Sequence, residues 1–404
     1  MSLIDGLDRR NFLRAVGSAG IASSLPHSIL ALDASGRSFA QEVLQPTPQE
    51  PPQYSIKFAA CGMSHDHIWG MIGAMQRGGG VLVAGYASEP DKIAMFQKRF
   101  PGVKLAASED EILNDPTIQL VLSSKIPSER ADLGIRAMRA GKDFLSDKPG
   151  VTTLEQLAEV RRMIGETKRI YGIMYSERLE VKASVKAGEL IQAGAIGQVI
   201  QTINIAPHQV IQNGGDAGGG TGRPDWFWVP EQSGGILCDL GSHQVDQFLY
   251  YTGSTQAEIV ESQLANVNHP EYPRFQDFGD MVLRGNKGFG YVRIDWFTPK
   301  GLGVWGDGRL FVLGTEGYIE VRKYANVGIS HQGDNLFIVD QKQARYIDCR
   351  NGDLPFGRQF VSDVVNRTHT AQDQTQCLLA AELVVKAQMH ATTAKIEKQS
   401  WISS

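Results

Sequence analysis

The sequence predicts an α/β domain with a parallel, doubly wound sheet, followed by an α+β domain with a large, open, mainly antiparallel sheet. Strand-like and helix-like segments alternate between residue 54 and about residue 168, which is typical of a parallel sheet covered by helices. Beyond Lys168 the alternation fades and long strand-like segments follow one another, which indicates an antiparallel sheet. The length of 404 residues fits two such domains, because domains average roughly 150 residues.

The first predicted domain opens with a short apolar strand at residues 56–61, which Gly62 ends. Parallel sheets of this kind bind ligands beyond the carboxyl ends of their strands, so we expect a binding site at that edge. Further strands are predicted at residues 81–87, 104–106, 118–123 and 143–146, and helices at residues 65–76, 91–99 and 128–140.

The second predicted domain consists of consecutive strands joined by turn signals such as Gly285-Asn286. A large open sheet rarely leaves an apolar face bare, so we expect one face to bind further copies of the chain as a dimer or tetramer. The last predicted element is a helix at residues 374–390. The strands are predicted at residues 199–205, 258–265, 280–283, 290–296, 309–312 and 317–321.

The first residues resemble a twin-arginine export signal. Arg9 and Arg10 are followed by Phe12 and Leu13 and then by a mildly apolar stretch. We therefore expect residues 1–34 to be a signal peptide and the protein to be periplasmic or secreted. The alternative is an amphipathic helix with two surface arginines.

Composition sets the remaining boundaries. Residues 41–53 are rich in Gln and Pro, which predicts a linker over residues 35–54. The parallel-sheet domain is then placed at residues 55–175 and the second domain at residues 176–404.

Charge and cysteine content exclude several classes of protein. The formal net charge is −4 and no basic block is present, which argues against a nucleic-acid partner. No apolar run reaches the roughly 20 residues of a membrane-spanning helix, so we expect no membrane anchor. The cysteines form no CxxC or CxxH pattern, and buried free thiols are favoured over two disulfides. They are Cys61, Cys238, Cys349 and Cys377.

The turn after the first strand is the expected place for the phosphates of a dinucleotide. The usual fingerprint is GxGxxG, but here the run is Gly62-Met63-Ser64-His65-Asp66-His67, which keeps only the first glycine. Ser64 still offers a backbone N–H and a hydroxyl at the start of the following helix. The residues expected to contact a dinucleotide are Gly62, Met63, Ser64, His65, Ser88, Ser123 and Lys148.

The identity of the dinucleotide stays open, and no metal is predicted. The acidic residue that normally binds the ribose is missing at Ala87. Glu89 in its place favours NAD, whereas Ser88 could bind the 2′-phosphate of NADP. His65 and His67 have the spacing of a metal-binding pair, but no third ligand lies near them in the sequence.

Two further segments carry a resemblance to a known family. Residues 141–149, GKDFLSDKP, resemble the GKHVxxEKP segment of the glucose–fructose oxidoreductase, inositol dehydrogenase and MocA family, with Asp147 in place of the usual Glu. Residues 234–246 resemble that family's GGGxxxDxGxHxxD motif. The resemblance extends from residue 56 to the C-terminus. It implies a Rossmann domain that binds NAD(P), followed by an open-sheet domain.

The resemblance implies that Lys148, beside the nicotinamide, contacts the reacting hydroxyl. Asp239 and His243 are spaced i,i+4, so both face the same way if a helix begins near Asp239. His243 is then the expected proton acceptor, because its ordinary pKa lies near neutrality. Asp239 either orients that imidazole or binds a neighbouring substrate hydroxyl. The alternative is that Asp239 caps a helix and His243 belongs to the core.

Four residues are expected to line a substrate pocket: Arg178, His208, Trp226 and Asp246. Arg178 matches an arginine of the family, although Ser176-Glu177 replaces the usual Asn-Tyr. Trp226 offers an aromatic face to a sugar, or else it is a core residue.

The predicted function is oxidation or reduction of a sugar, sugar derivative or polyol by a tightly bound NAD or NADP. A retained cofactor follows from the predicted export, because the periplasm holds little free nicotinamide. Two alternatives use the same scaffold: NAD-assisted glycoside hydrolysis or elimination, and non-catalytic sugar binding.

Overall fold

The computed structural model describes residues 30–32, 38–46, 51–210 and 223–397. The paired arginines and most of the expected signal peptide lie outside the described residues. Within the described residues, no helix is both long and apolar enough to cross a bilayer.

The first sheet is parallel and contains six strands in the order β5-β4-β3-β6-β7-β8, which confirms the predicted Rossmann architecture. Strands β6, β7 and β8 are buried along their whole length because helices cover both faces. The strands are β3 (Ile56–Cys61), β4 (Gly80–Tyr86), β5 (Lys104–Leu105), β6 (Leu120–Ser123), β7 (Asp143–Asp147) and β8 (Tyr171–Met174). The helices are α2 (His67–Arg77), α3 (Pro90–Arg99), α4 (Glu109–Asn114), α5 (Arg130–Arg139) and α6 (Leu154–Thr167).

The second sheet is mixed but mostly antiparallel, as predicted, and has eleven strands among the described residues. Their order is β1-β2-β16-β15-β14-β13-β9-β12-β11-β10-β17. Its longer strands are β9 (Val199–Pro207), β10 (Ala257–Ala265), β11 (Phe278–Gly285), β12 (Phe289–Asp295), β13 (Arg309–Gly314), β14 (Gly317–Arg322), β15 (Asn335–Asp340) and β16 (Ala344–Asp348). The remaining strands are β1 (Leu30–Leu32), β2 (Ser38–Val43) and β17 (Thr392–Thr393).

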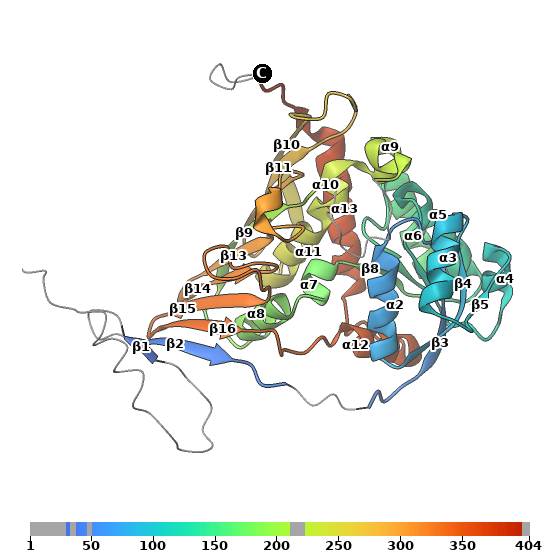
Figure 1. The fold of residues 1–404 in the computed structure, drawn as a ribbon, viewed down its shortest axis with the longest axis horizontal. Helices are drawn as coiled ribbons and strands as arrows, with labels where there is room; N and C mark the ends of the chain where they lie inside the picture. The colour runs from blue at the N-terminus through green and yellow to red at the C-terminus, as the bar shows by residue number, and fades with distance from the viewer. Residues whose placement is uncertain (1–29, 33–37, 47–50, 211–222, 398–404) are drawn as a thin grey trace, which may run out of the picture.

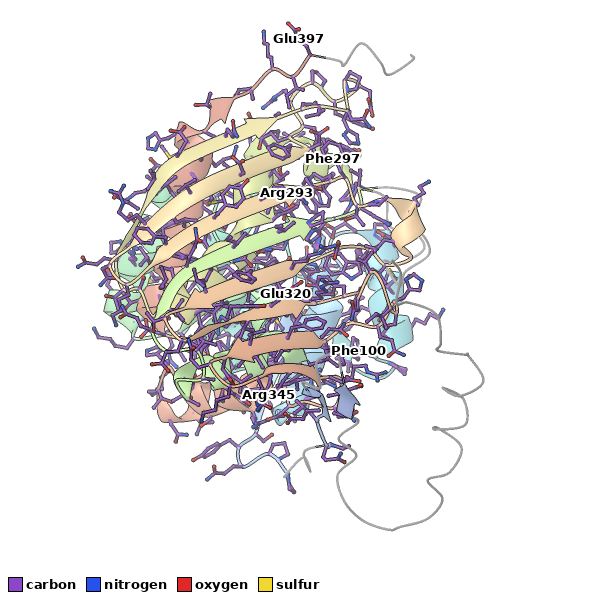
Figure 2. All side chains as sticks on the ribbon, turned by 90° about the vertical axis from the view of Figure 1, so that its left-hand side faces the viewer. Phe100, Arg293, Phe297, Glu320, Arg345 and Glu397 are labelled. Atoms are coloured by element: carbon purple, nitrogen blue, oxygen red, sulfur yellow. The ribbon has the colours of Figure 1, made fainter. Side chains whose placement is uncertain are left out.

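Helices cover only one face of this sheet (Figure 1). They are α8 (Lys182–Gln192), α11 (Gly241–Thr252) and α13 (Gln374–His390). The opposite face is a broad surface of side chains without a covering helix (Figure 2). Residues along β11 and β12 alternate between this open face and the helix-covered face, as the period of a strand requires.

The expected linker is partly wrong. Ser38–Val43 forms β2, which pairs in parallel with β16, so this stretch belongs to the second sheet. The expected signal peptide also reaches into the sheet, because Leu30–Leu32 pairs with β2 as β1. A Gln- and Pro-rich composition is typical of an unstructured linker. The sequence alone does not show that β16, far along the chain, pairs with part of this segment.

Short elements connect the two sheets. Helix α13 contacts α6 and β8 on one side and α10, α11 and β10 on the other. Helix α12 returns to α2, so the chain's later part packs against the first sheet. The short helices are α7 (Ser176–Leu179), α9 (Pro230–Ser233), α10 (Gly235–Asp239) and α12 (Phe356–Asn366), and 3-10 turns lie at Pro127–Glu129, Asp225–Trp228 and Lys300–Leu302.

Candidate active site

Lys148 and Asp239 form an ion pair between the two domains. Lys148 follows β7 directly and therefore emerges at the carboxyl edge of the first sheet, as predicted. Its ammonium donates a hydrogen bond to Oδ1 of Asp239 at 2.7 Å. Lys148 is only 4% exposed, so this carboxylate is the main compensation for its buried charge.

Asp239 neither begins a helix nor caps one, which were the two positions expected from the sequence. It is the last residue of α10, and α11 begins at Gly241. Its carboxylate binds Lys148 rather than the His243 imidazole. The expected orienting contact from Asp239 to His243 is therefore absent from the described residues.

His243 is buried in the first turn of α11. Burial lowers the pKa of its imidazole well below the ordinary value, and Lys148 adds to this effect. Its Nδ1 atom has no hydrogen-bond partner within the described part of the chain. A neutral imidazole with an unused ring nitrogen is suited to accept a proton.

A buried charged network lies behind His243, and sequence reasoning missed it. Lys323 and Gln244 both donate to Oε2 of Glu177, at 2.5 Å and 3.0 Å. Burial raises the pKa of Glu177, but Lys323 and two histidines outweigh this effect and lower it to about 2. The sequence offered one indication of this network: Ser176-Glu177 stands where the family usually has Asn-Tyr.

His208 lies at the edge of this network, with Nε2 3.8 Å from Oε1 of Glu177. Its Nδ1 contacts the carbonyl of Ala206 at 3.2 Å, and the edge of its ring meets Trp305. Burial lowers the pKa of His208 to about 4, so it is neutral near pH 7. It is 9% exposed, which leaves it close to the site but largely covered.

Arg178 and Asp246 do not fit the expected role of substrate contacts. Arg178 binds Asp246 through two hydrogen bonds, from Nε to Oδ2 at 2.6 Å and from Nη2 to Oδ1 at 3.0 Å. The guanidinium also lies over the ring of Tyr250. Both charged groups are buried and are directed at one another, so the pair joins α7 to α11 rather than facing an open pocket.

Trp226 lies in the core that continues between the two sheets. It is 8% exposed, and its ring centroid is 6.0 Å from that of His65. Trp226 is therefore a core residue, which was the alternative to a sugar contact. Because it lies near His65, it is also beside the turn expected to bind the dinucleotide.

The turn expected to bind the dinucleotide, residues 62–67, has no room for a side chain at its first residue. Gly62 has φ +80°, and a Cβ atom there would lie 2.9 Å from Cβ of Lys125. Only glycine fits this conformation and approach. The side chain of Met63 is fully buried in the core and cannot contact a ligand in the loop. Ser123 is also buried, and its hydroxyl accepts from the backbone N–H of Lys125.

Glu89 occupies the position expected for the ribose-binding acid. Its carboxylate accepts from Ser64 Oγ at 2.5 Å and from both the backbone N–H and the hydroxyl of Ser88. Thus Ser64 and Ser88 hold Glu89 beside the glycine turn. An oriented carboxylate and a glycine-only turn fit an NAD(P) dinucleotide, although the second and third glycines of the fingerprint are absent.

Three further side chains meet at the start of α2. Nδ1 of His67 lies 2.9 Å from Oδ1 of Asp147, and Nδ1 of His65 lies 3.4 Å from Oδ2. Arg130 also contacts Oδ2 at 3.1 Å. Although burial raises it, the pKa of Asp147 is held well below its ordinary value by His67 and Arg130. The structure thus supplies the third group that the sequence did not place near the two histidines.

All four cysteines are buried and free, as expected, and desolvation raises the pKa of each thiol. These thiols are therefore packing residues rather than nucleophiles.

The two sheets and the site between them define the nicotinamide-dependent oxidoreductases with a Rossmann domain and an open-sheet domain. The family model for the oxidoreductase family with an NAD-binding Rossmann fold matches residues 60–175. The model for the GFO/IDH/MocA C-terminal domain matches residues 184–320. The chain belongs to the GFO/IDH/MocA oxidoreductase family, and family members are NAD(P)-dependent dehydrogenases and reductases.

Individual relatives agree with this assignment. A solved structure from Erwinia carotovora atroseptica SCRI1043, described only as an oxidoreductase, is 43% identical, with a TM-score of 0.80, covering 84% of this chain and 100% of that one. D-xylose dehydrogenase from Paenarthrobacter nicotinovorans is 29% identical over 38% of each chain. scyllo-Inositol 2-dehydrogenase (NAD(+)) from Bacillus subtilis strain 168 is 27% identical over 59% of this chain and 67% of its own.

The curated matches are partial. The match spans 42%, 38% and 49% of the length of the first three curated relatives. These relatives therefore indicate the family, and their substrates do not transfer to this chain without a test.

Proposed function

We propose that this protein interconverts a secondary alcohol of a sugar, sugar derivative or polyol and the corresponding ketone, with a tightly held nicotinamide dinucleotide. The observation that carries the proposal is the buried Lys148–Asp239 pair at the carboxyl edge of the Rossmann sheet, next to the neutral His243. The relatives named for D-xylose and scyllo-inositol support a polyhydroxylated substrate.

The side chains divide the chemistry between them. The Lys148 ammonium donates a hydrogen bond to the reacting oxygen and stabilises the developing alkoxide. Asp239 keeps that ammonium oriented at 2.7 Å. The neutral imidazole of His243, which lies close to Lys148, takes the hydroxyl proton. When bound, the nicotinamide supplies the acceptor for the hydride that leaves the carbinol carbon.

We propose NAD rather than NADP as the cofactor. Glu89 is held by Ser64 and Ser88 in the ribose-binding position. There its carboxylate would accept hydrogen bonds from a ribose diol and repel a 2′-phosphate. The alternative role of Ser88 is less favourable, because its hydroxyl already donates to Glu89.

We further propose export and self-association. The paired Arg9 and Arg10 support transport by the twin-arginine route, and cell fractionation that leaves the protein in the cytoplasm would contradict it. The uncovered face of the second sheet supports a homo-oligomer. This face carries partly exposed apolar side chains, including Val260, Val282, Phe289, Leu313 and Tyr318.

The decisive experiment identifies any nucleotide released by acid from undialysed protein, followed by a panel of sugars and polyols monitored by nicotinamide absorbance. Bound NAD with a sugar-dependent absorbance change is the expected result. Bound nucleotide without net absorbance change, but with cleavage of a glycoside, would favour the NAD-assisted hydrolase. Failure to bind any nucleotide would overturn the proposal.

A further inference from the structure

We propose that His65, His67 and Asp147 bind one divalent first-row transition metal ion at the start of α2. His65 comes from the turn between β3 and α2, His67 is the first residue of α2, and Asp147 ends β7. One ligand atom from each residue lies within 4.8 Å of the others. Two imidazoles and a carboxylate form the donor set that suits Zn²⁺, Fe²⁺ and related ions. Because His65 is also an expected dinucleotide contact, the test below measures metal binding itself and not activity.

The distances between the donor atoms fit a common metal. Ligands bound at about 2.1 Å to one ion are themselves separated by about 3.0 to 3.4 Å in octahedral or tetrahedral geometry. His67 Nδ1 lies 2.9 Å from Oδ1 of Asp147, and His65 Nδ1 lies 3.4 Å from Oδ2. The carboxylate therefore offers one oxygen beside each imidazole, so that one ion bound between the three side chains would contact both oxygens.

The lone pair of His65 Nδ1 lies beside Asp147. The backbone N–H of His67 lies 3.3 Å from Nδ1 of His65. Because a backbone N–H can only donate, this nitrogen presents a lone pair. Oδ2 of Asp147 lies 3.4 Å from the same nitrogen, and a bound metal ion would take this lone pair in place of the long contact with the N–H.

Asp147 supplies a second, independent indication. Its carboxylate is 1% exposed, and Oδ2 makes no hydrogen bond within the described residues. Arg130 forms an ion pair with that oxygen at 3.1 Å, while also donating to the carbonyls of Lys125 and Lys148. A carboxylate oxygen has two lone pairs, so the contact with Arg130 leaves one directed at the histidines.

The cluster is accessible to an ion. The His67 side chain is 41% exposed, whereas that of His65 is 18% exposed. A cavity of about 240 Å³ adjoins His67 and Asp147 and extends to Met174, Ser176 and Glu180. It leaves room for water or another ligand to complete the coordination of a metal that has only three protein ligands.

The test uses the full chain after dialysis against a chelator, with Co²⁺ and then Zn²⁺ as the probes. Visible absorption and elemental analysis should give one bound Co²⁺ per chain, displaced by Zn²⁺. The NMR spectrum of the Co²⁺ form should contain two contact-shifted, exchangeable imidazole N–H signals, one from each histidine.

His67→Asn is the main variant because its exposed side chain can be replaced without opening the core. We expect it to weaken Co²⁺ binding by more than the roughly 10- to 100-fold loss caused by removing an outer-sphere partner. One of the two shifted signals should also disappear. His331→Asn is the matched control, since His331 lies outside the cluster and contacts only the carbonyl of Leu302.

Thermal unfolding of both variants without metal checks that they fold. Saturable binding in the wild type and the control, lost in His67→Asn, would support the site. Absence of saturable binding, or equal affinity in wild type and His67→Asn, would overturn it. In that case Arg130 alone balances the charge of Asp147.

Discussion

The charge on Lys148 is useful only because a carboxylate from the other domain keeps it in place. Lys148 follows β7 and Asp239 ends α10, so the pair forms only when the two domains are assembled. The ammonium lies at the edge where ligands of parallel sheets bind. Its removal should therefore affect the reaction more than it affects binding of the dinucleotide.

We expect Lys148→Ala to lower kcat by about 10²- to 10³-fold, which is the loss typical of removing one transition-state donor. The amount of co-purified nucleotide should stay unchanged. Stopped assays and acid release of nucleotide measure the two effects. Lys287→Ala serves as the control, and an unaltered kcat in Lys148→Ala would remove this lysine from the mechanism.

The buried histidines predict how stability depends on pH. Burial lowers the pKa of His208 to about 4 and that of His243 well below its ordinary value. Between pH 7 and 5.5 the unfolded chain therefore takes up protons that the folded chain does not. The free energy of unfolding should fall with decreasing pH, by up to about 1.4 kcal/mol per pH unit for each histidine below its unfolded pKa of roughly 6.5.

Urea unfolding at pH 7 and 5.5 measures this loss of stability. The carboxylates stay ionised in the unfolded chain over this interval, so the histidines dominate the change. His208→Gln should show a shallower dependence than the wild type. A wild-type stability that is constant over the interval would contradict the prediction.

At the same scale, the sequence located Lys148, Asp239 and His243 because each lies in a short motif. It did not locate Glu177 with Lys323, whose positions differ by 146, or His67 with Asp147, whose positions differ by 80. Such contacts depend on the tertiary fold. The pairing of Arg178 with Asp246 was missed for the same reason, and it leaves their expected role as substrate contacts unsupported.

At the scale of elements, the buried Arg178–Asp246 pair joins the short helix α7 to the long helix α11. Helix α11 also carries His243, so this connection positions the proton acceptor indirectly. Desolvation raises the pKa of Asp246 despite the nearby guanidinium. The unpaired guanidinium would be costly if Asp246 were removed.

We expect Asp246→Ala to lower the free energy of unfolding by about 3 to 5 kcal/mol, as when one partner of a buried ion pair is lost. Asp246→Asn should cost less, because its amide oxygen can still accept one hydrogen bond. Urea unfolding of both variants gives the comparison. Normal stability together with a raised KM would instead restore Asp246 as a substrate contact.

Sequence patterns predicted elements best where one residue preference continued over a long segment. The last long helix was predicted at residues 374–390, a run rich in Leu, Ala and Gln, and α13 has these bounds. Strands β15 and β16 were missed, because they do not alternate cleanly between buried and exposed residues. Helix α12 was missed as well, and its valines, such as Val361 and Val364, have low helix propensity.

For the whole molecule, the open face of the second sheet is the main unexplained surface. Val282 on β11 and Phe289 on β12 are 41% and 53% exposed, and Phe311 stacks on Tyr318 further along the sheet. Arginine side chains such as Arg293 lie among them (Figure 2). Aromatic residues and arginine are enriched in protein interfaces.

We expect Val282→Lys to shift the protein from oligomer to monomer, because it places a charge among the exposed apolar side chains of this face. Size-exclusion chromatography with light scattering measures the mass. Val327→Lys is the matched control, since Val327 is similarly exposed, at 54%, but lies outside the strands. A wild-type monomer would contradict the proposed interface.

The pairing of β2 with β16 has a consequence for the order of synthesis. Ala40 lies opposite Arg345, so one segment pairs with another that the ribosome makes 305 residues later. The second sheet cannot be completed before both segments have emerged. A polypeptide halted in mid-translation would hold this strand without its partner, and a chaperone that binds extended segments would find it there.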